Sequence, residues 1–237
     1  MQRERDAQQL ARSLEQIFRL IAEDLAAKLL GSVTKAEPDR KLSDRARAII
    51  TLQTSQMFGR SAQRALQGTG LEGRARNAGQ TTVARDFSQR LTELADVLRR
   101  TADSKSEAAV ARVLERREGA SRRELAAALT EEIGGTFNRD RALTWARTEA
   151  AVADNSGAAA AYEAAGVQRI EWIAFKAPVW PRRHDLLDGE VRNLGDFFDM
   201  PRSSARLRWP HDPLGPVGEV VNCRCSHRPV IRRSRSP

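Results

Sequence analysis

The sequence has few of the features that reveal how a protein is held together or where it resides. It contains two cysteines in 237 residues, so disulfides cannot be its main support and it needs a hydrophobic core of its own. No apolar run approaches the roughly 18 residues of a membrane span, so we expect no transmembrane segment. The first residues are charged and lead into an amphipathic pattern, so we expect no secretory signal.

Common catalytic and nucleic-acid-binding motifs are also absent. There is no P-loop, no Gly-x-Ser-x-Gly nucleophile motif and no His-Glu-x-x-His zinc motif. A zinc finger, an RNP motif and a clear helix-turn-helix are missing as well. We therefore expect the chain not to be an enzyme, and we expect any nucleic-acid contact to be independent of base sequence.

Positive charge is concentrated at the C-terminal end. The formal net charge is +9, and residues 202–237 hold eight arginines against Asp212 and Glu219. Arginines that contact phosphates give affinity that falls with salt and does not depend on base sequence. Docking on an acidic protein partner and a simply solvated tail are the alternatives. The candidate phosphate contacts are Arg206, Arg208, Arg232, Arg233 and Arg235.

Apolar residues recur at helical spacing through the first two-thirds of the chain. The spacing predicts helices over about 10–29, 42–67, 80–102 and 139–165, with a short helix ending near 117 and another that begins at a capping box of Ser121 and Glu124. Gly31 and Gly166 are expected stops. The glycine-rich stretch 68–79 is predicted to be a long loop or hinge, and residues 103–106 are predicted to break the helical pattern. The run 158–161, four alanines within the last helix, favours close packing against a neighbour.

The sequence changes character at about residue 167. An alternating stretch over 169–175 predicts a half-buried strand, and most prolines, three of the four tryptophans and all three histidines lie in this last part. We predict an α+β protein with a long N-terminal helical region and a small, irregular α+β C-terminal domain. The expected boundaries are a helical arm over 1–137, the domain over 138–231 and a basic tail over 232–237.

Thiols and imidazoles in the C-terminal part form a candidate metal site. Cys223 and Cys225 would project to the same side of an extended strand, and His184 from an earlier loop would complete a Cys₂His set for Zn²⁺. A fourth ligand is left open among His211, His227 and Asp188. Two alternatives stay open, namely small buried thiols without a metal and a Cys–His pair that activates a thiolate.

Several separated segments together resemble one protein family, that of the phage Mu F-type minor head proteins and the head morphogenesis proteins of Bacillus-phage type. Their order and approximate spacing match the family, and His184, Cys223 and Cys225 fall on family positions. His211 stands where many members carry glycine, so it is not counted as a family ligand. The matching segments are 146–149 (Ala-Arg-Thr-Glu), Asn155, Tyr162, Gly166, Trp172, 183–189 (Arg-His-Asp-Leu-Leu-Asp-Gly), 209–213 (Trp-Pro-His-Asp-Pro) and 219–225 (Glu-Val-Val-Asn-Cys-Arg-Cys).

The resemblance implies a minor structural protein of a tailed-phage head. Such a protein is present in few copies near the portal, contacts the portal protein or the major capsid protein, and takes part in head assembly and in packaging or ejection of DNA. It would reside in the virion after assembly in the host cytoplasm. The alternatives are a metal-dependent hydrolase or nuclease that uses His184, Cys223 and Cys225, and a sequence-independent DNA-binding protein.

Overall fold

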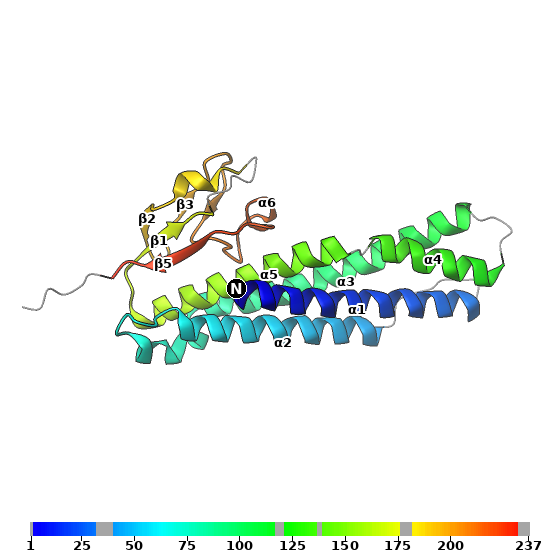
Figure 1. Cartoon of the computed structure of the whole chain (residues 1–237), viewed down its shortest axis with the longest axis horizontal. Coiled ribbons are helices and arrows are strands. Elements are labelled where there is room, and N and C mark those ends of the chain that lie inside the picture. The colour runs from blue at the N-terminus through cyan, green and yellow to red at the C-terminus, as the bar shows by residue number, and fades with distance from the viewer. Residues whose placement is uncertain (1, 32–39, 117–120, 137–138, 176–181, 232–237) are drawn as a thin grey trace, which may run out of the picture. The chain divides into compact units, whose positions relative to one another are not determined.

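The protein has an α+β fold in which long helices precede small antiparallel sheets. The computed structural model describes residues 2–31, 40–116, 121–136, 139–175 and 182–231 (Figure 1). The helical part consists of α1 (Gln2–Gly31), α2 (Arg40–Arg64), the 3-10 helix η1 (Glu72–Gln80), α3 (Thr82–Arg116), α4 (Arg122–Thr136) and α5 (Arg139–Ala165).

Short strands and helical turns make up the rest of the described chain. A three-stranded antiparallel sheet has the order β2-β1-β5, and β3 pairs with β4 in a separate two-stranded sheet. These elements are β1 (Arg169–Ile173), the 3-10 helix η2 (His184–Leu187), β2 (Val191–Asn193), β3 (Phe198–Asp199), β4 (Arg206–Leu207), the helical turn α6 (Val217–Val220) and β5 (Ser226–Pro229). The α+β class expected from the sequence is thereby confirmed.

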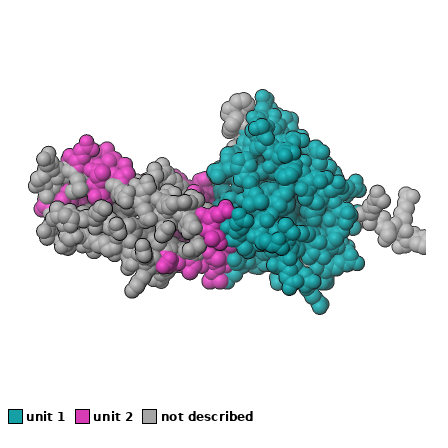
Figure 2. All heavy atoms as spheres, turned by 180° about the vertical axis from the view of Figure 1, so that it is seen from behind, with its two compact units in different colours: residues 1–6, 54–90, 147–237 teal, residues 7–53, 91–146 magenta. Residues whose placement is uncertain are grey.

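The chain forms two compact units, each assembled from separated segments. Unit 1 comprises residues 1–6, 54–90 and 147–237, and unit 2 comprises residues 7–53 and 91–146 (Figure 2). These units follow proximity in space, so the predicted boundaries at 137 and 231 along the chain stay predictions.

Several local predictions are confirmed. Helix α4 follows the predicted capping box, in which the Ser121 amide donates to the Glu124 carboxylate at 2.8 Å and the Glu124 amide donates to the Ser121 hydroxyl at 3.4 Å. Gly166 ends α5 with a φ of +72°, a conformation that glycine adopts without steric cost.

Two expected interruptions of the helical region are wrong. Helix α3 runs without a break through residues 103–106, because Asp, Ser and Lys each cost well below 1 kcal/mol inside a helix. The stretch 68–79 is a turn followed by η1, not a long loop. The Glu72 carboxylate accepts the Gly68 amide at 2.7 Å, which folds the segment back on itself.

Within unit 1, small residues let α5 approach α2 closely. A Cβ atom added at Gly157 would meet the backbone carbonyl oxygen of Phe58 and lie 3.0 Å from Cβ of Ser61. The Ser61 hydroxyl donates to the backbone carbonyl of Asp154 at 2.6 Å. The predicted close packing therefore centres on Gly157, one residue before the alanine run.

The sheet contributes the apolar side chains that surround the C-terminal cluster. Ile170 and Trp172 are fully buried and alternate with partly exposed residues, as predicted for this strand. The centre of the Trp172 ring lies 5.1 Å from the centre of the Phe198 ring and 5.7 Å from the centre of the His184 ring, which it meets edge to face. The strand therefore presents an apolar wall to the candidate site.

Candidate metal centre

The structure brings His184, Cys223 and Cys225 together. Nδ1 of His184 lies 3.5 Å from Sγ of Cys223 and 3.9 Å from Sγ of Cys225, and all three side chains are buried. Zn–S and Zn–N bonds of about 2.3 and 2.0–2.1 Å at a tetrahedral angle place the ligand atoms about 3.6 Å apart. The cluster can therefore hold a metal ion such as zinc.

The two cysteines lie between a turn at residues 221–222 and strand β5, in the segment 221–225, named here the Cys-x-Cys turn. Asn222 has a φ of +54°, and its amide donates to the Thr148 hydroxyl on α5 at 3.0 Å. Strand β5 begins at Ser226, directly after Cys225, so the cysteines precede the strand, and both thiols lie on the side of His184, as expected for a Cys-x-Cys pair. The Cys225 amide also donates to Sγ of Cys223 at 3.4 Å.

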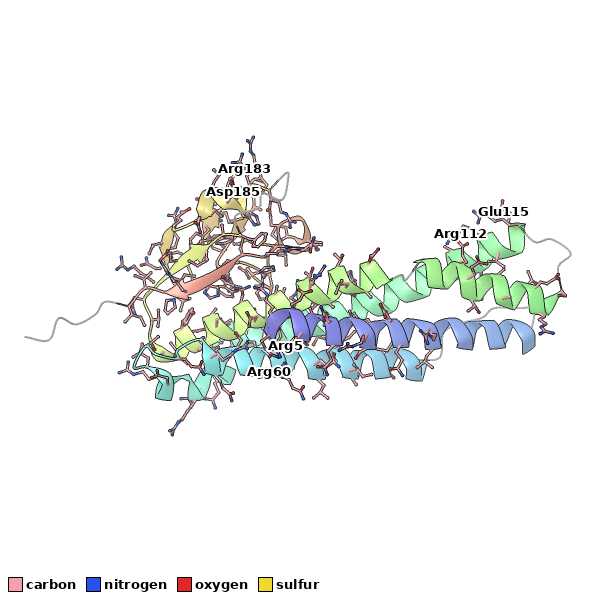
Figure 3. The ribbon with its side chains drawn as sticks, viewed as in Figure 1. Arg5, Arg60, Arg112, Glu115, Arg183 and Asp185 are labelled. Atoms are coloured by element: carbon pink, nitrogen blue, oxygen red, sulfur yellow. The ribbon has the colours of Figure 1, made fainter. Side chains whose placement is uncertain are left out.

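His184 is directed inward by the residues beside it. Arg183 has a left-handed φ of +55°, and its guanidinium binds the Asp185 carboxylate through contacts of 2.9 and 3.0 Å (Figure 3). Arg183 and Asp185 are paired with each other and partly exposed, whereas His184 between them is buried. Gly189 closes the segment with a φ of +80°, the turn geometry that a side chain disfavours.

A buried carboxylate lies behind the imidazole. Nε2 of His184 lies 2.7 Å from Oε2 of Glu219 on α6, and the Ser203 hydroxyl donates to Oε1 of Glu219 at 2.7 Å. The carboxylate occupies one ring nitrogen and leaves Nδ1 directed at the thiols.

Hydrogen bonds and burial shift the pKa values of the two cysteines in the cluster in opposite directions. Hydrogen bonds from Cys223 and His184 lower the pKa of Cys225 to about 4 despite burial. The pKa of Cys223 is raised, because its hydrogen bond to Cys225 and its burial both favour the thiol. Burial opposes the charged form of His184, but its hydrogen bonds to Cys225 and Glu219 outweigh burial and raise its pKa. A thiolate, the form that binds metals, is therefore favoured at Cys225.

The three candidates for a fourth ligand are engaged elsewhere. His211 uses both ring nitrogens, on the Asn155 side chain at 3.0 Å and on the Cys223 carbonyl at 2.9 Å. Nε2 of His227 donates to the Asn155 carbonyl at 3.0 Å, and the Asp188 carboxylate accepts the Ala174 amide at 2.9 Å. The described residues thus provide three close ligands, and none of the three candidates joins them.

Three consecutive residues of α5, at positions 147–149, contact different partners within unit 1. Arg147 binds Glu4 at 2.8 Å, and Glu149 accepts a hydrogen bond from Arg90 at 3.0 Å. Thr148 accepts the Asn222 amide, as described above. These contacts give residues 147–149 a structural role within unit 1.

Sequence reasoning did not assign roles to three residues that support the cluster. Asn155 and Glu219 lie in the segments that carry the family resemblance, and that was the signal that could have identified them. Ser203 carries no motif that would single it out. Its proximity to Glu219 comes from the loop between β3 and β4, which is a tertiary feature.

The candidate phosphate-binding arginines have different environments. Arg206 is exposed, with its guanidinium 4.8 Å from the centre of the Phe197 ring. Arg208 is largely buried and binds Asp86 and Asp212, each at 2.7 Å, so its guanidinium faces protein carboxylates. Arg232, Arg233 and Arg235 lie outside the described residues.

Comparisons with known proteins find a partial relative. The chain is 33% identical over 98 residues to the uncharacterized protein YqbB of Bacillus subtilis (strain 168), a match that covers 40% of this chain and 32% of that protein. The matched part therefore spans about a third of the relative's length. No family model matches the chain, and no solved structure matches it. Within the described residues, every helix is too short or too polar to cross a membrane.

Proposed function

We propose that this chain is a minor structural protein of a tailed-phage head and that Zn²⁺ on His184, Cys223 and Cys225 holds its C-terminal module together. The observation that carries the proposal is the convergence of the family-like segments in one buried cluster. Residues from α5, η2, α6 and the Cys-x-Cys turn meet there although nearly 80 positions separate the first segment from the last.

The cluster connects helix α5 to the sheet within unit 1. Thr148 and Asn155 of α5 bind the Cys-x-Cys turn at Asn222 and Cys225. A metal ion on the two thiolates and His184 adds the η2 loop to this assembly. Such a site supplies folding energy to a module too irregular to build a large core.

Zinc is the metal that the donor set favours. Thiolate and imidazole ligands select zinc among the common divalent ions, whereas magnesium and calcium prefer oxygen. The backbone amide of Cys225 points at Sγ of Cys223, an arrangement that stabilises a metal-bound thiolate by hydrogen bonding.

The proposed partners follow from the family resemblance and from charge. We propose that the protein contacts the portal protein or the major capsid protein in few copies per particle. Its basic C-terminal end, with the exposed Arg206 and the arginines of the tail, is suited to lie against packaged DNA by electrostatic attraction.

The test is to locate the protein in purified particles of the phage that encodes it. We expect quantitative mass spectrometry to find the chain in DNA-filled heads at a few copies relative to the portal. Labelling with antibodies should place it at the portal vertex. Its complete absence from heads and from their assembly intermediates would overturn the proposal.

A metal-dependent hydrolase is the second candidate, and the three-ligand set favours it. Catalytic zinc sites use three protein ligands and leave the fourth position to water, and the described residues offer three. Cleavage of DNA with added Zn²⁺ or Mg²⁺, lost in His184→Ala while the circular dichroism spectrum is unchanged, would support this function. Heads that contain the protein and a purified chain without such activity would favour the structural role.

A further inference from the structure

We propose that Glu219 is a positioning residue, which fixes His184 with Nδ1 as the metal ligand and thereby sets the metal affinity of the site. This inference rests on the zinc site proposed above. It assigns a role in that site to Glu219, a residue that is not itself a metal ligand.

The imidazole of His184 has a different partner on each ring nitrogen. The two ring nitrogens of His184 have different partners, with Oε2 of Glu219 at 2.7 Å from Nε2 and the two thiol sulfurs at 3.5 and 3.9 Å from Nδ1. A carboxylate accepts a hydrogen bond, so Nε2 carries the proton and donates. Nδ1 is then the nitrogen that faces the sulfurs, and a metal between them takes its lone pair in place of the proton that it donates to Cys225 in the metal-free protein.

Glu219 is buried and held by hydrogen bonds to both of its carboxylate oxygens. The side chain is only 10% exposed, and its other oxygen, Oε1, accepts a hydrogen bond from the Ser203 hydroxyl at 2.7 Å. Both oxygens are thus occupied, one by the imidazole and one by a loop on the other side of the carboxylate. A carboxylate fixed from two directions restricts the rotation of the His184 ring.

Burial makes the charge of the Glu219 carboxylate energetically important. A buried carboxylate without a counter-charge is costly, and when His184 gives up a proton to bind a divalent ion, that ion supplies the counter-charge to Glu219. Carboxylates that accept the second N–H of a ligating histidine orient the ring and increase its basicity, and their loss typically reduces metal affinity about 10- to 100-fold. Glu219 has the position and the burial for this role.

A purely structural ion pair is the competing explanation. In that case Glu219 and a protonated His184 would stabilise the fold without regard to metal. Glu219→Gln would then lower the stability of the metal-free protein and leave the zinc affinity of the folded protein unchanged. The two explanations therefore differ in which quantity changes.

The test measures zinc affinity of the full chain by competition with a chromophoric chelator, together with thermal unfolding of the metal-free protein. We expect Glu219→Gln to weaken zinc binding about 10- to 100-fold. Ser203→Ala removes one hydrogen bond from Glu219 at an exposed position, so we expect a loss of about two- to tenfold. Glu190→Gln, at a carboxylate paired with Arg192 on the surface, is the matched control and should bind zinc as the wild type does.

The outcomes separate this inference from the zinc site itself. If the wild type binds zinc tightly and both Glu219→Gln and Ser203→Ala bind it equally well, the positioning role is refuted and the zinc site stands. If the wild type binds no zinc, the zinc site and the inference both fail. Should Glu219→Gln fail to fold, Ser203→Ala alone decides, because Ser203 is an exposed residue outside the core.

Discussion

The side-chain nitrogen of Asn155 lies 3.0 Å from Nδ1 of His211. Because the amide donates, Nδ1 of His211 accepts, and the ring proton lies on Nε2, which donates to the Cys223 carbonyl at 2.9 Å. Asn155 thereby connects α5, through a neutral histidine, to the turn that holds the thiols. Burial lowers the pKa of His211 well below its usual value, which keeps this ring neutral.

Asn155→Leu should destabilise unit 1 strongly. The change is close to isosteric, but it leaves Nδ1 of His211 without its donor and weakens the support of the Cys225 carbonyl at 3.4 Å. Buried groups left without partners cost about 1–3 kcal/mol each, so we expect a loss of about 2–4 kcal/mol. Urea unfolding measures it. The exposed Asn193→Ala is the control, with an expected change within about 0.5 kcal/mol, and equal effects of the two would contradict the account.

Stability should fall as the pH is lowered from about 6.5 to 4. Burial lowers the pKa of His227 to about 4, and its Nδ1 is buried with no hydrogen-bond partner among the described residues. Between these pH values the unfolded chain binds more protons than the folded one, so acid favours unfolding. Titration of His227 does not lower the free energy of unfolding above pH 6.5. At pH 4 it has lowered the free energy of unfolding by about 3 kcal/mol.

Comparison of the wild type with His227→Gln isolates this contribution from the release of metal in acid. The glutamine amide can still donate to the Asn155 carbonyl but does not titrate in this range. We expect the variant to lose less stability than the wild type over the same pH interval, as measured by urea unfolding at each pH. Identical pH profiles would show that His227 is not the titrating group.

Gly157→Ala should destabilise the packing of α5 against α2. Its Cβ would meet the Phe58 carbonyl oxygen, and forcing extra atoms into such a contact costs about 1–3 kcal/mol. Gly59→Ala is the matched control, because Gly59 lies in α2 with no atom within 4 Å of an added Cβ. That change should stabilise the helix by about 0.5–1 kcal/mol. Thermal unfolding of the two variants should therefore shift in opposite directions, and a shift of both in the same direction would refute this packing.

Arg208→Met should destabilise unit 1 and reveal Arg208 as a structural residue. The guanidinium neutralises Asp86 and Asp212, and the Asp212 side chain is only 3% exposed. Removing one partner of a buried ion pair costs about 3–5 kcal/mol. Arg228→Ala at the surface pair with Glu171 is the control, with an expected cost of about 0–1 kcal/mol. If denaturant midpoints change equally in both, the Arg208 network contributes no more than a surface ion pair.

Local sequence signals were sufficient for most of the fold. Apolar spacing and terminal residues such as Ser121 and Gly166 identified the helices, because these signals act within a few residues. The missed features are those that depend on distant partners or on weak propensities. Continuation of α3 through 103–106 needs only modest helix formers, and the folding of the 68–79 stretch depends on the Glu72 carboxylate.

The candidate site was predictable as a set of residues but not as an arrangement. His184, Cys223 and Cys225 stood out by residue type and by the family resemblance, and the structure places them together. The left-handed conformation of Asn222, which precedes the two cysteines, is one that asparagine adopts more readily than most residues, but residue type alone does not predict it at this position. The engagement of His211 and His227 by Asn155 likewise arises from contacts across more than 50 positions.

Native mass spectrometry of the freshly purified full chain, with elemental analysis of the same sample, tests the central claim most directly. The account predicts one zinc ion per chain, and Cys223→Ser is expected to lose both the metal and stability, since binding energy at such a site is folding energy. A wild-type chain that is fully folded at its metal-free mass, and that takes up no zinc when zinc is added, would contradict the account.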